Sequence, residues 1–215
     1  MTVSSAAMTD PGTTVLDALA QRLDRDPDGA YLDFEGTALT AREAGVVSTR
    51  VAHALAELGV RRGDRVATLL ENGPEQVLSF FGALKLGAIQ VPINTAYKGE
   101  FLRHQLVDSG ARVLVVHGDF ASRVAAVMTS VVPELEAVVV AGEPDLPGVG
   151  VPALDWSAVV DAAPASAPPS ADVGPDDLAC LIYTAGTTGP SKGCMLPQHY
   201  IVCLADQIAR AWQTM

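Results

Sequence analysis

The 215-residue sequence has few cysteines and few basic side chains. Its three cysteines, Cys180, Cys194 and Cys203, form no Cys-x-x-Cys pair and have no paired histidine spacing beside them, so neither a disulfide framework nor a zinc site is predicted. Fourteen Lys and Arg against 25 Asp and Glu give a formal net charge of −11, the opposite of the basic surface that nucleic-acid binding needs. We therefore expect no nucleic-acid partner, no metal site and a reducing, cytoplasmic location.

A long apolar segment is also lacking. No run of 18 apolar residues occurs, and residues 1–10 contain neither a basic nor an apolar signal region, so no transmembrane segment and no secretory signal are predicted. The 49% hydrophobic and 18% charged content instead indicates a folded domain with a core. Residues 1–12 are expected to form a disordered tail.

The N-terminal segments predict a helix, a hairpin and a second helix. Apolar residues at helical spacing predict a helix over 15–23, which the turn residues 26–29 end. A hairpin is predicted over 31–39. Thr40 and Glu43 then form a capping box, which predicts the start of the second helix.

From residue 63 onward, apolar strand patterns alternate with helical patterns. Strands are predicted over 65–70, 88–93, 112–117, 137–141 and 178–183, and helices over 74–86, 98–108, 119–131 and from 198 to the end. This rhythm of repeated βα units predicts an α/β fold with a mainly parallel sheet and right-handed crossovers.

A change of composition interrupts the rhythm at residues 143–175, which are rich in Pro, Ala and Ser. They predict a surface connection with a single helix over 154–160. Within it, residues 162–169 have little to bury and are expected to be mobile. A short apolar piece at 194–196 precedes the last helix.

The segment Thr184-Ala185-Gly186-Thr187-Thr188-Gly189-Pro190-Ser191-Lys192-Gly193 follows the last apolar strand directly. Its glycines let backbone N–H groups approach an anion, its threonines add hydroxyl donors, and Lys192 adds a positive charge. The composition suits a phosphate cradle. It departs from the P-loop pattern GxxxxGK[ST], because Ser191 and Gly193 flank the lysine where Gly and Ser or Thr are required. A flexible surface loop with no ligand remains an alternative.

Tyr183 to Gly193 resembles the phosphate-binding signature of the adenylate-forming ligases, a Tyr-Thr-Ser-Gly-Thr-Thr-Gly-x-Pro-Lys-Gly pattern. That superfamily contains acyl-CoA synthetases, peptide-synthetase adenylation domains and luciferases. The likeness extends over residues 39–200, because further segments similar to the family's motifs occur in the family's order: Leu39–Glu43, Gly63–Ala67, Asn72–Glu75, Lys85–Ala88, Val91–Asn94 and Asp108–Ala111.

Three positions depart from the family pattern. Ala185 stands where serine is usual, Ser191 where proline is usual, and Pro197-Gln198 where Thr or Ser precedes His. An uncompensated loss of one hydroxyl bond to a charged group costs about 1.5–3 kcal/mol. The glycines, Thr187, Thr188 and Lys192 remain.

The resemblance implies that residues 13–215 are a partial AMP-binding domain, the N-terminal portion of an adenylate-forming ligase large domain, with its strand and phosphate loop at 178–200. It implies an ATP-dependent carboxylic acid–CoA ligase that acts through an acyl-adenylate on a fatty acid or related small acid, with Mg²⁺ and coenzyme A. The variant at 190–195 resembles the carnitine and crotonobetaine CoA-ligase branch. By the same resemblance, the ATP phosphates contact Thr184, Ala185, Gly186, Thr187, Thr188, Gly189 and Lys192.

Later motifs of the family have no match in this sequence: the aromatic-Gly-x-Thr-Glu adenine segment, the ribose-binding aspartate, the Arg-Asp hinge and the catalytic lysine. No catalytic residue is therefore identified, and we expect a truncated N-terminal part that is inactive alone. The alternatives are a nucleotide- or phosphate-binding module that works with a separately encoded C-terminal half, and a structural protein with an incidental loop.

Other chemistry-bearing residues are given structural roles. Lys85 and Lys98 are expected to be a helix-face charge and a helix start. His199 is kept as a weak site candidate because it is seven residues from Lys192. The pair Asp176-Asp177 is expected to begin a strand rather than to bind a metal.

Overall fold

The computed structural model describes residues 12–128, 132–143, 149–166, 171–184 and 190–213. Its elements are α1 (Val15–Arg25), β1 (Ala30–Phe34), β2 (Thr37–Thr40), α2 (Ala41–Glu57), β3 (Arg65–Leu69), α3 (Pro74–Lys85), β4 (Ile89–Pro92), α4 (Glu100–Ser109), β5 (Ala111–His117), the 3₁₀ helix η2 (Gly118–Phe120), α5 (Ala121–Met128), β6 (Ala137–Ala141), β7 (Ala153–Asp155), α6 (Trp156–Ala162), β8 (Leu178–Thr184), β9 (Lys192–Pro197) and α7 (Gln198–Gln213).

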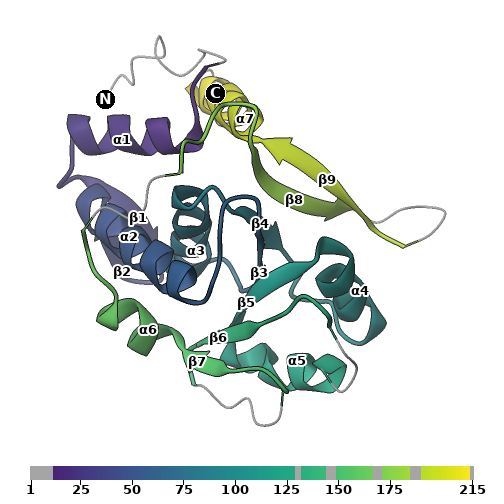
Figure 1. Ribbon diagram of the computed structural model, residues 1–215. Coiled ribbons are helices and arrows are strands. Elements are labelled where there is room, and N and C mark those ends of the chain that lie inside the picture. The colour runs from purple at the N-terminus through teal and green to yellow at the C-terminus, as the bar shows by residue number, and fades with distance from the viewer. Residues whose placement is uncertain (1–11, 129–131, 144–148, 167–170, 185–189, 214–215) are drawn as a thin grey trace.

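A seven-stranded sheet with the order β7-β6-β5-β3-β4-β8-β9 forms the centre of the molecule (Figure 1). All neighbouring pairs are parallel except β8 and β9, which form an antiparallel hairpin. The predicted α/β fold with a mainly parallel sheet is confirmed. A separate two-stranded antiparallel sheet, β1–β2, is the predicted hairpin.

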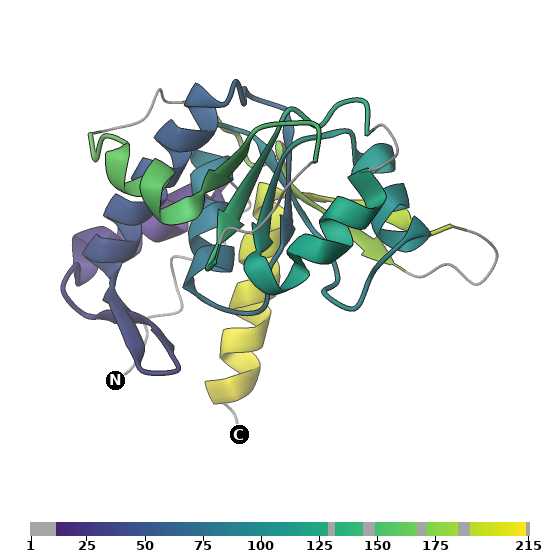
Figure 2. The same cartoon turned by 90° about the horizontal axis from the view of Figure 1, so that it is seen from below.

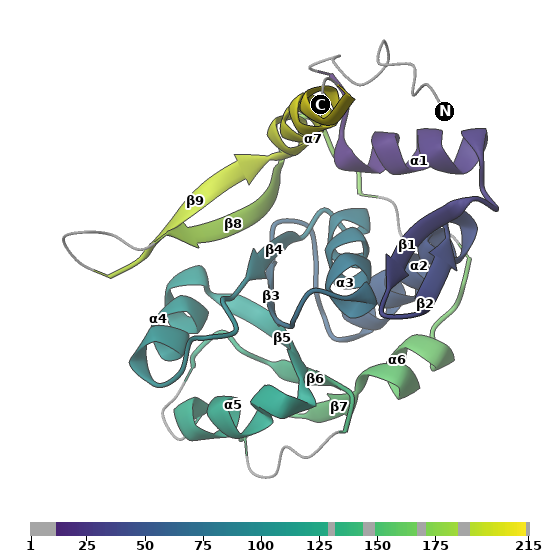
Figure 3. The same cartoon turned by 180° about the vertical axis from the view of Figure 1, so that it is seen from behind.

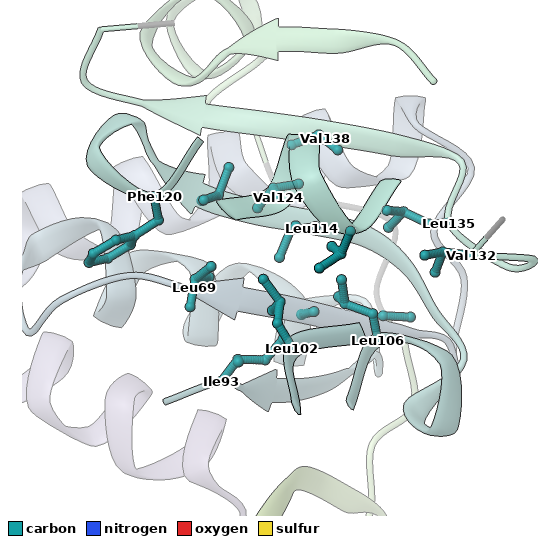
Figure 4. Packing of buried hydrophobic residues seen from close by; sticks show 14 of the residues in the cluster. Leu69, Ile93, Leu102, Leu106, Leu114, Phe120, Val124, Val132, Leu135 and Val138 are labelled. Atoms are coloured by element: carbon teal, nitrogen blue, oxygen red, sulfur yellow. The ribbon is translucent and has the colours of Figure 1, made fainter. Parts of the chain in front are cut away.

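Helices cover both faces of the sheet, because successive residues of its buried strands point to opposite sides. Leu114 and Val116 of β5 belong to the core under α4 and α5, whereas Val113 and Val115 belong to the core under α2, α3 and α6. Figure 4 shows the first core, in which side chains of α4 and α5 meet those of β3 and β5.

A third, smaller core joins the two ends of the described chain. Val15 of α1 and Val202 of α7 pack with Phe81 and Leu84 of α3. The backbone N–H of Val15 also donates to Oε1 of the buried Gln198, at 3.2 Å. Helices α1 and α7 consequently lie side by side, as Figures 1 and 3 show.

The element boundaries agree closely with the sequence predictions wherever a cap or a long apolar run marks them. Both bonds of the predicted capping box form, since Thr40 Oγ1 accepts from the N–H of Glu43 and the Glu43 carboxylate accepts from the N–H of Thr40. The strand over 137–141 has the predicted bounds. The helix expected over 119–131 begins instead as η2 before continuing as α5.

Residues 143–175 are not only a surface connection, and the helix expected over 154–160 is partly a strand. Strand β7 pairs in parallel with β6 and extends the sheet at its edge, and α6 begins only at Trp156. These residues form a strand rather than a helix because they pair with β6, where the N–H of Val138 donates to the carbonyl of Pro152 at 2.9 Å. Asp155 then caps α6 by accepting from the N–H of Ala158 at 2.7 Å.

Two predictions fall outside the described residues. The expected disordered tail, residues 1–12, is described only at Gly12, and the expected mobile segment is described only up to Ser166. In the described ranges, no helix combines the length and the apolar character needed to cross a membrane.

Candidate functional site

The hairpin β8–β9 carries the predicted phosphate loop. Cross-strand pairs Tyr183↔Gly193 and Thr184↔Lys192 are the last ones before the loop. Figures 1 and 2 both show this end of the hairpin extending beyond the rest of the sheet. Five of the predicted contact residues, Ala185, Gly186, Thr187, Thr188 and Gly189, lie outside the described residues. The structure therefore places Thr184 and Lys192 opposite each other at the base of the loop.

Lys192 is exposed, and its ammonium makes no hydrogen bond or ion pair with any described residue. Thr184, across the strand, is exposed as well. A cation without a carboxylate partner, next to a hydroxyl donor, fits the phosphate oxygens of a nucleotide. The two described residues of the predicted site are consistent with triphosphate binding.

Side chains of α4 contact both strands of the hairpin next to the loop. The ring Nε2 of His104 lies 2.9 Å from the carbonyl oxygen of Ser191, which only accepts, so this nitrogen donates. The hydroxyl of Tyr183 donates to Oδ2 of Asp108 at 2.6 Å. Burial and the Asp108 carboxylate both raise the pKa of Tyr183 well above its usual value, so it remains a donor. Sequence analysis predicted neither contact, because the partners lie 87 and 75 residues apart in the sequence.

A hollow of about 420 Å³ lies beside the hairpin, at the carboxyl ends of β3 and β4. In parallel α/β sheets this is the edge at which ligands bind, and the volume suits a small molecule. Gln76, Gln105, Tyr97 and Tyr183 are among its lining residues. Gln105 is 1% exposed, and Oε1 of Gln76 and of Gln105 has no hydrogen-bond partner in the described chain. Two residues that line the hollow thus carry buried amide oxygens with no hydrogen-bond partner in the described chain.

His199 does not join the site. It lies beyond Pro197, at the end of β9 opposite to Lys192, and its Nδ1 donates to the carbonyl of Pro175 at 2.9 Å. Asp177 lies just before β8, and both of its carboxylate oxygens accept from the same guanidinium nitrogen of Arg62. The described partners of His199 and Asp177 are thus Pro175 and Arg62, not Thr184 or Lys192.

Lys85 has a structural role, as expected, although its ammonium is not on a free helix face. It donates to the carbonyl of Gly45 and to the hydroxyls of Ser48 and Thr49, each at 2.8 Å. Lys98 is exposed just before α4. Within the described ranges, no group of three or more His, Cys, Asp or Glu side chains is placed to hold a metal ion.

Residues 19–215 match the family model described as AMP-binding enzyme, so the chain belongs to this family of adenylate-forming ligases. The family includes acyl-CoA synthetases and the adenylation domains of peptide synthetases. Curated relatives of both kinds are similar to this chain. A feruloyl-CoA synthase of Amycolatopsis is 36% identical over 176 residues, which are 82% of this chain and 32% of that protein. Tyrocidine synthase 3 of Brevibacillus parabrevis is 34% identical over 185 residues, 86% of this chain and 3% of that protein.

Solved structures give the same result for the fold. The anthranilate CoA ligase AuaEII, in complex with anthranoyl-AMP, superposes with a TM-score of 0.81 at 32% identity, over 88% of this chain and 36% of that one. The N-terminal domain of FACL13 from Mycobacterium tuberculosis superposes with a TM-score of 0.69 at 29% identity, over 84% and 43%. The chain thus spans about a third of the feruloyl-CoA synthase and of the anthranilate CoA ligase.

Proposed function

We propose that this chain supplies the triphosphate-binding part of an ATP-dependent carboxylic acid–CoA ligase that acts through an acyl-adenylate. The observation that carries the proposal is the exposed ammonium of Lys192, opposite Thr184, at the two ends of a loop with the family's phosphate-binding pattern. We favour thioester formation with coenzyme A because two proteins that are similar to most of this chain are a feruloyl-CoA synthase and an anthranilate CoA ligase.

The chemical difficulty of the reaction is charge. A carboxylate must attack an α-phosphate that is already surrounded by negative oxygens, and fixed donors and cations at the phosphates lower that barrier. Lys192 would attract the β- and γ-phosphate oxygens, and Thr184 would donate its hydroxyl to them. Mg²⁺, when bound with ATP, supplies further neutralisation of the phosphate charge.

The substrate is proposed to be a small carboxylic acid, a fatty acid or a related acid, in the cytoplasm. A link to the carnitine and crotonobetaine branch rests only on the sequence variant at 190–195. The relatives are much longer than this chain. We therefore propose the complete ligase reaction only for this chain acting together with the remaining part of a ligase.

One observation favours the alternative of a phosphate-binding module that pairs with a separately encoded half. Tyr200, Leu204, Ile208 and Trp212 follow each other at four-residue spacing on α7, and all four are exposed. Residues four apart share one face of a helix. An apolar stripe of this kind is typical of a surface that another polypeptide covers.

Titration calorimetry with inorganic tripolyphosphate and with MgATP tests the proposal. We expect Lys192→Ala to weaken tripolyphosphate binding by about tenfold or more, because a charge-assisted bond of about 1.5–3 kcal/mol is lost. Lys98→Ala is the matched control, since Lys98 is also exposed but lies outside the hairpin. Equal binding by the unmodified chain and Lys192→Ala would contradict the proposal.

A second measurement tests whether this chain catalyses adenylate formation by itself. ATP–pyrophosphate exchange in the presence of a panel of carboxylic acids reports adenylate formation directly. Exchange by this chain alone supports a ligase that needs no partner. Tripolyphosphate binding without exchange is the result expected for a chain that binds phosphate but needs the rest of a ligase for adenylation.

A further inference from the structure

At the end of the β8–β9 hairpin that carries the loop, β8 has no backbone pairing with β4 in the described chain. Strand β8 pairs with β4 only at Gln90↔Cys180. Its later residues, 181–184, pair only with β9 in the described chain. A two-stranded ribbon by itself is only marginally stable in water. Contacts other than backbone pairing with β4 must therefore fix the position of residues 181–184.

Helix α4 provides that contact on both strands. His104 and Asp108 are one helical turn apart, so they lie on one face of α4. His104 donates to the Ser191 carbonyl on the β9 side, and Asp108 accepts from the Tyr183 hydroxyl on β8. The rings of His104 and Tyr183 also meet edge to face, with centroids 6.3 Å apart. The three contacts involve Ser191, which is adjacent to Lys192, and Tyr183, which pairs across the hairpin with Gly193.

The helix itself is firmly anchored. Leu102 and Leu106 are completely buried on its other face, in the core with Leu69 and Leu114 (Figure 4). A contact to α4 is thus a contact to the main sheet.

We propose that His104 and Asp108 are positioning residues, which hold Ser191 and Tyr183 and thereby keep their neighbours Lys192 and Thr184 in place to bind phosphate. This inference rests on the proposed triphosphate binding. Fixing Lys192 and Thr184 before binding removes part of the entropy loss that the ligand would otherwise have to offset. Neither side chain touches the phosphates, and their effect passes through the hairpin.

Two measurements on the 215-residue chain test the proposal. Hydrogen exchange reports the protection of the backbone amides of residues 191–193, and calorimetry reports tripolyphosphate affinity. In His104→Leu and Tyr183→Phe we expect faster exchange at these amides and about tenfold weaker binding, with the thermal midpoint nearly unchanged. His104→Gln keeps an N–H donor and is expected to recover most of the affinity.

Matched controls come from the same chain. His53 makes the same kind of bond, from Nε2 to the carbonyl of Ser166 at 2.8 Å, but far from the hairpin. Tyr200 is an exposed tyrosine on α7. His53→Leu and Tyr200→Phe are expected to leave both readouts unchanged. Losses of the same size in these controls would mean a general structural effect and would overturn the proposal.

The result also distinguishes this inference from the proposed function. Unchanged exchange and unchanged affinity in His104→Leu and Tyr183→Phe would overturn the positioning role alone. If the unmodified chain and Lys192→Ala bind tripolyphosphate equally, the proposed function fails, and the positioning role fails with it. Faster exchange at residues 191–193 in His104→Leu and Tyr183→Phe would then assign the contact to hairpin stability only.

Discussion

Replacing Lys85 by methionine is expected to remove a pH dependence from the stability of the fold. Burial lowers the pKa of Lys85 from 10.5 to about 8. Between these values the unfolded chain binds a proton that the folded chain does not, so the free energy of unfolding rises with pH across this window. Below about pH 8 the ammonium is charged in both states, and its burial is a constant cost.

The size of the effect follows from the shift and from the surroundings of the ammonium. The difference of about 2.5 between the two pKa values corresponds to roughly 3.4 kcal/mol at most. Lys85 is partly exposed, and its three oxygen acceptors favour the charged form. We therefore expect a rise of only about 1–2 kcal/mol between pH 7 and pH 10. Methionine leaves the hydroxyls of Ser48 and Thr49 bonded to the carbonyl of Gly45.

Urea unfolding, followed by circular dichroism, measures the free energy of unfolding at several pH values between about 7 and 10. The informative quantity is the difference in unfolding free energy between the unmodified chain and Lys85→Met. That difference cancels other titrations, such as that of Cys180, whose pKa burial raises to about 11. Lys98→Met is the control for an exposed lysine. A difference that stays constant over this pH range would refute the reasoning.

Three further predictions concern packing, capping and association. Gly82→Ala should lower the free energy of unfolding by about 1–3 kcal/mol, because a Cβ there would lie 2.8 Å from Cβ of Val51 on α2; urea unfolding at or above the original stability would contradict this. Thr40→Ala should cost about 1 kcal/mol by the same assay, since it removes the cap of α2. Ile208→Lys with Trp212→Lys should reduce self-association in sedimentation velocity, because both side chains are exposed on the apolar stripe of α7; unchanged sedimentation would show that the stripe is not the contact.

The central strands could be predicted from sequence because their residues are apolar on both faces. Strands β3, β5 and β6 are almost fully buried, as expected inside a parallel sheet covered by helices. Strand β7 could not be predicted in this way. It has three residues after a proline, and only its pairing with β6 makes it a strand. Short segments carry too little periodic pattern to compete with such a tertiary effect.

The candidate site, like the fold, could be predicted from the sequence only in part. The loop pattern could be read directly, because its glycines, threonines and lysine are adjacent in sequence. The contact with α4 could not, since Tyr183 is 75 residues from Asp108 and Ser191 is 87 residues from His104. An isolated histidine on a helix gives no sign of such a partner. Topology brings these residues together through the placement of β8 beside β4.

The ion pairs of the fold show how few of the basic side chains are available to bind an anion. Many arginines are held by carboxylates within the fold, including the pairs Arg42–Asp28, Arg62–Asp177 and Arg112 with Asp64 and Glu136. These cations are therefore already engaged and attract further anions less strongly. Lys192 differs, because it has no partner in the described chain and lies beside the loop. On a protein of net charge −11, we therefore expect a polyphosphate to be drawn to this end of the hairpin by a local cation rather than by the overall field.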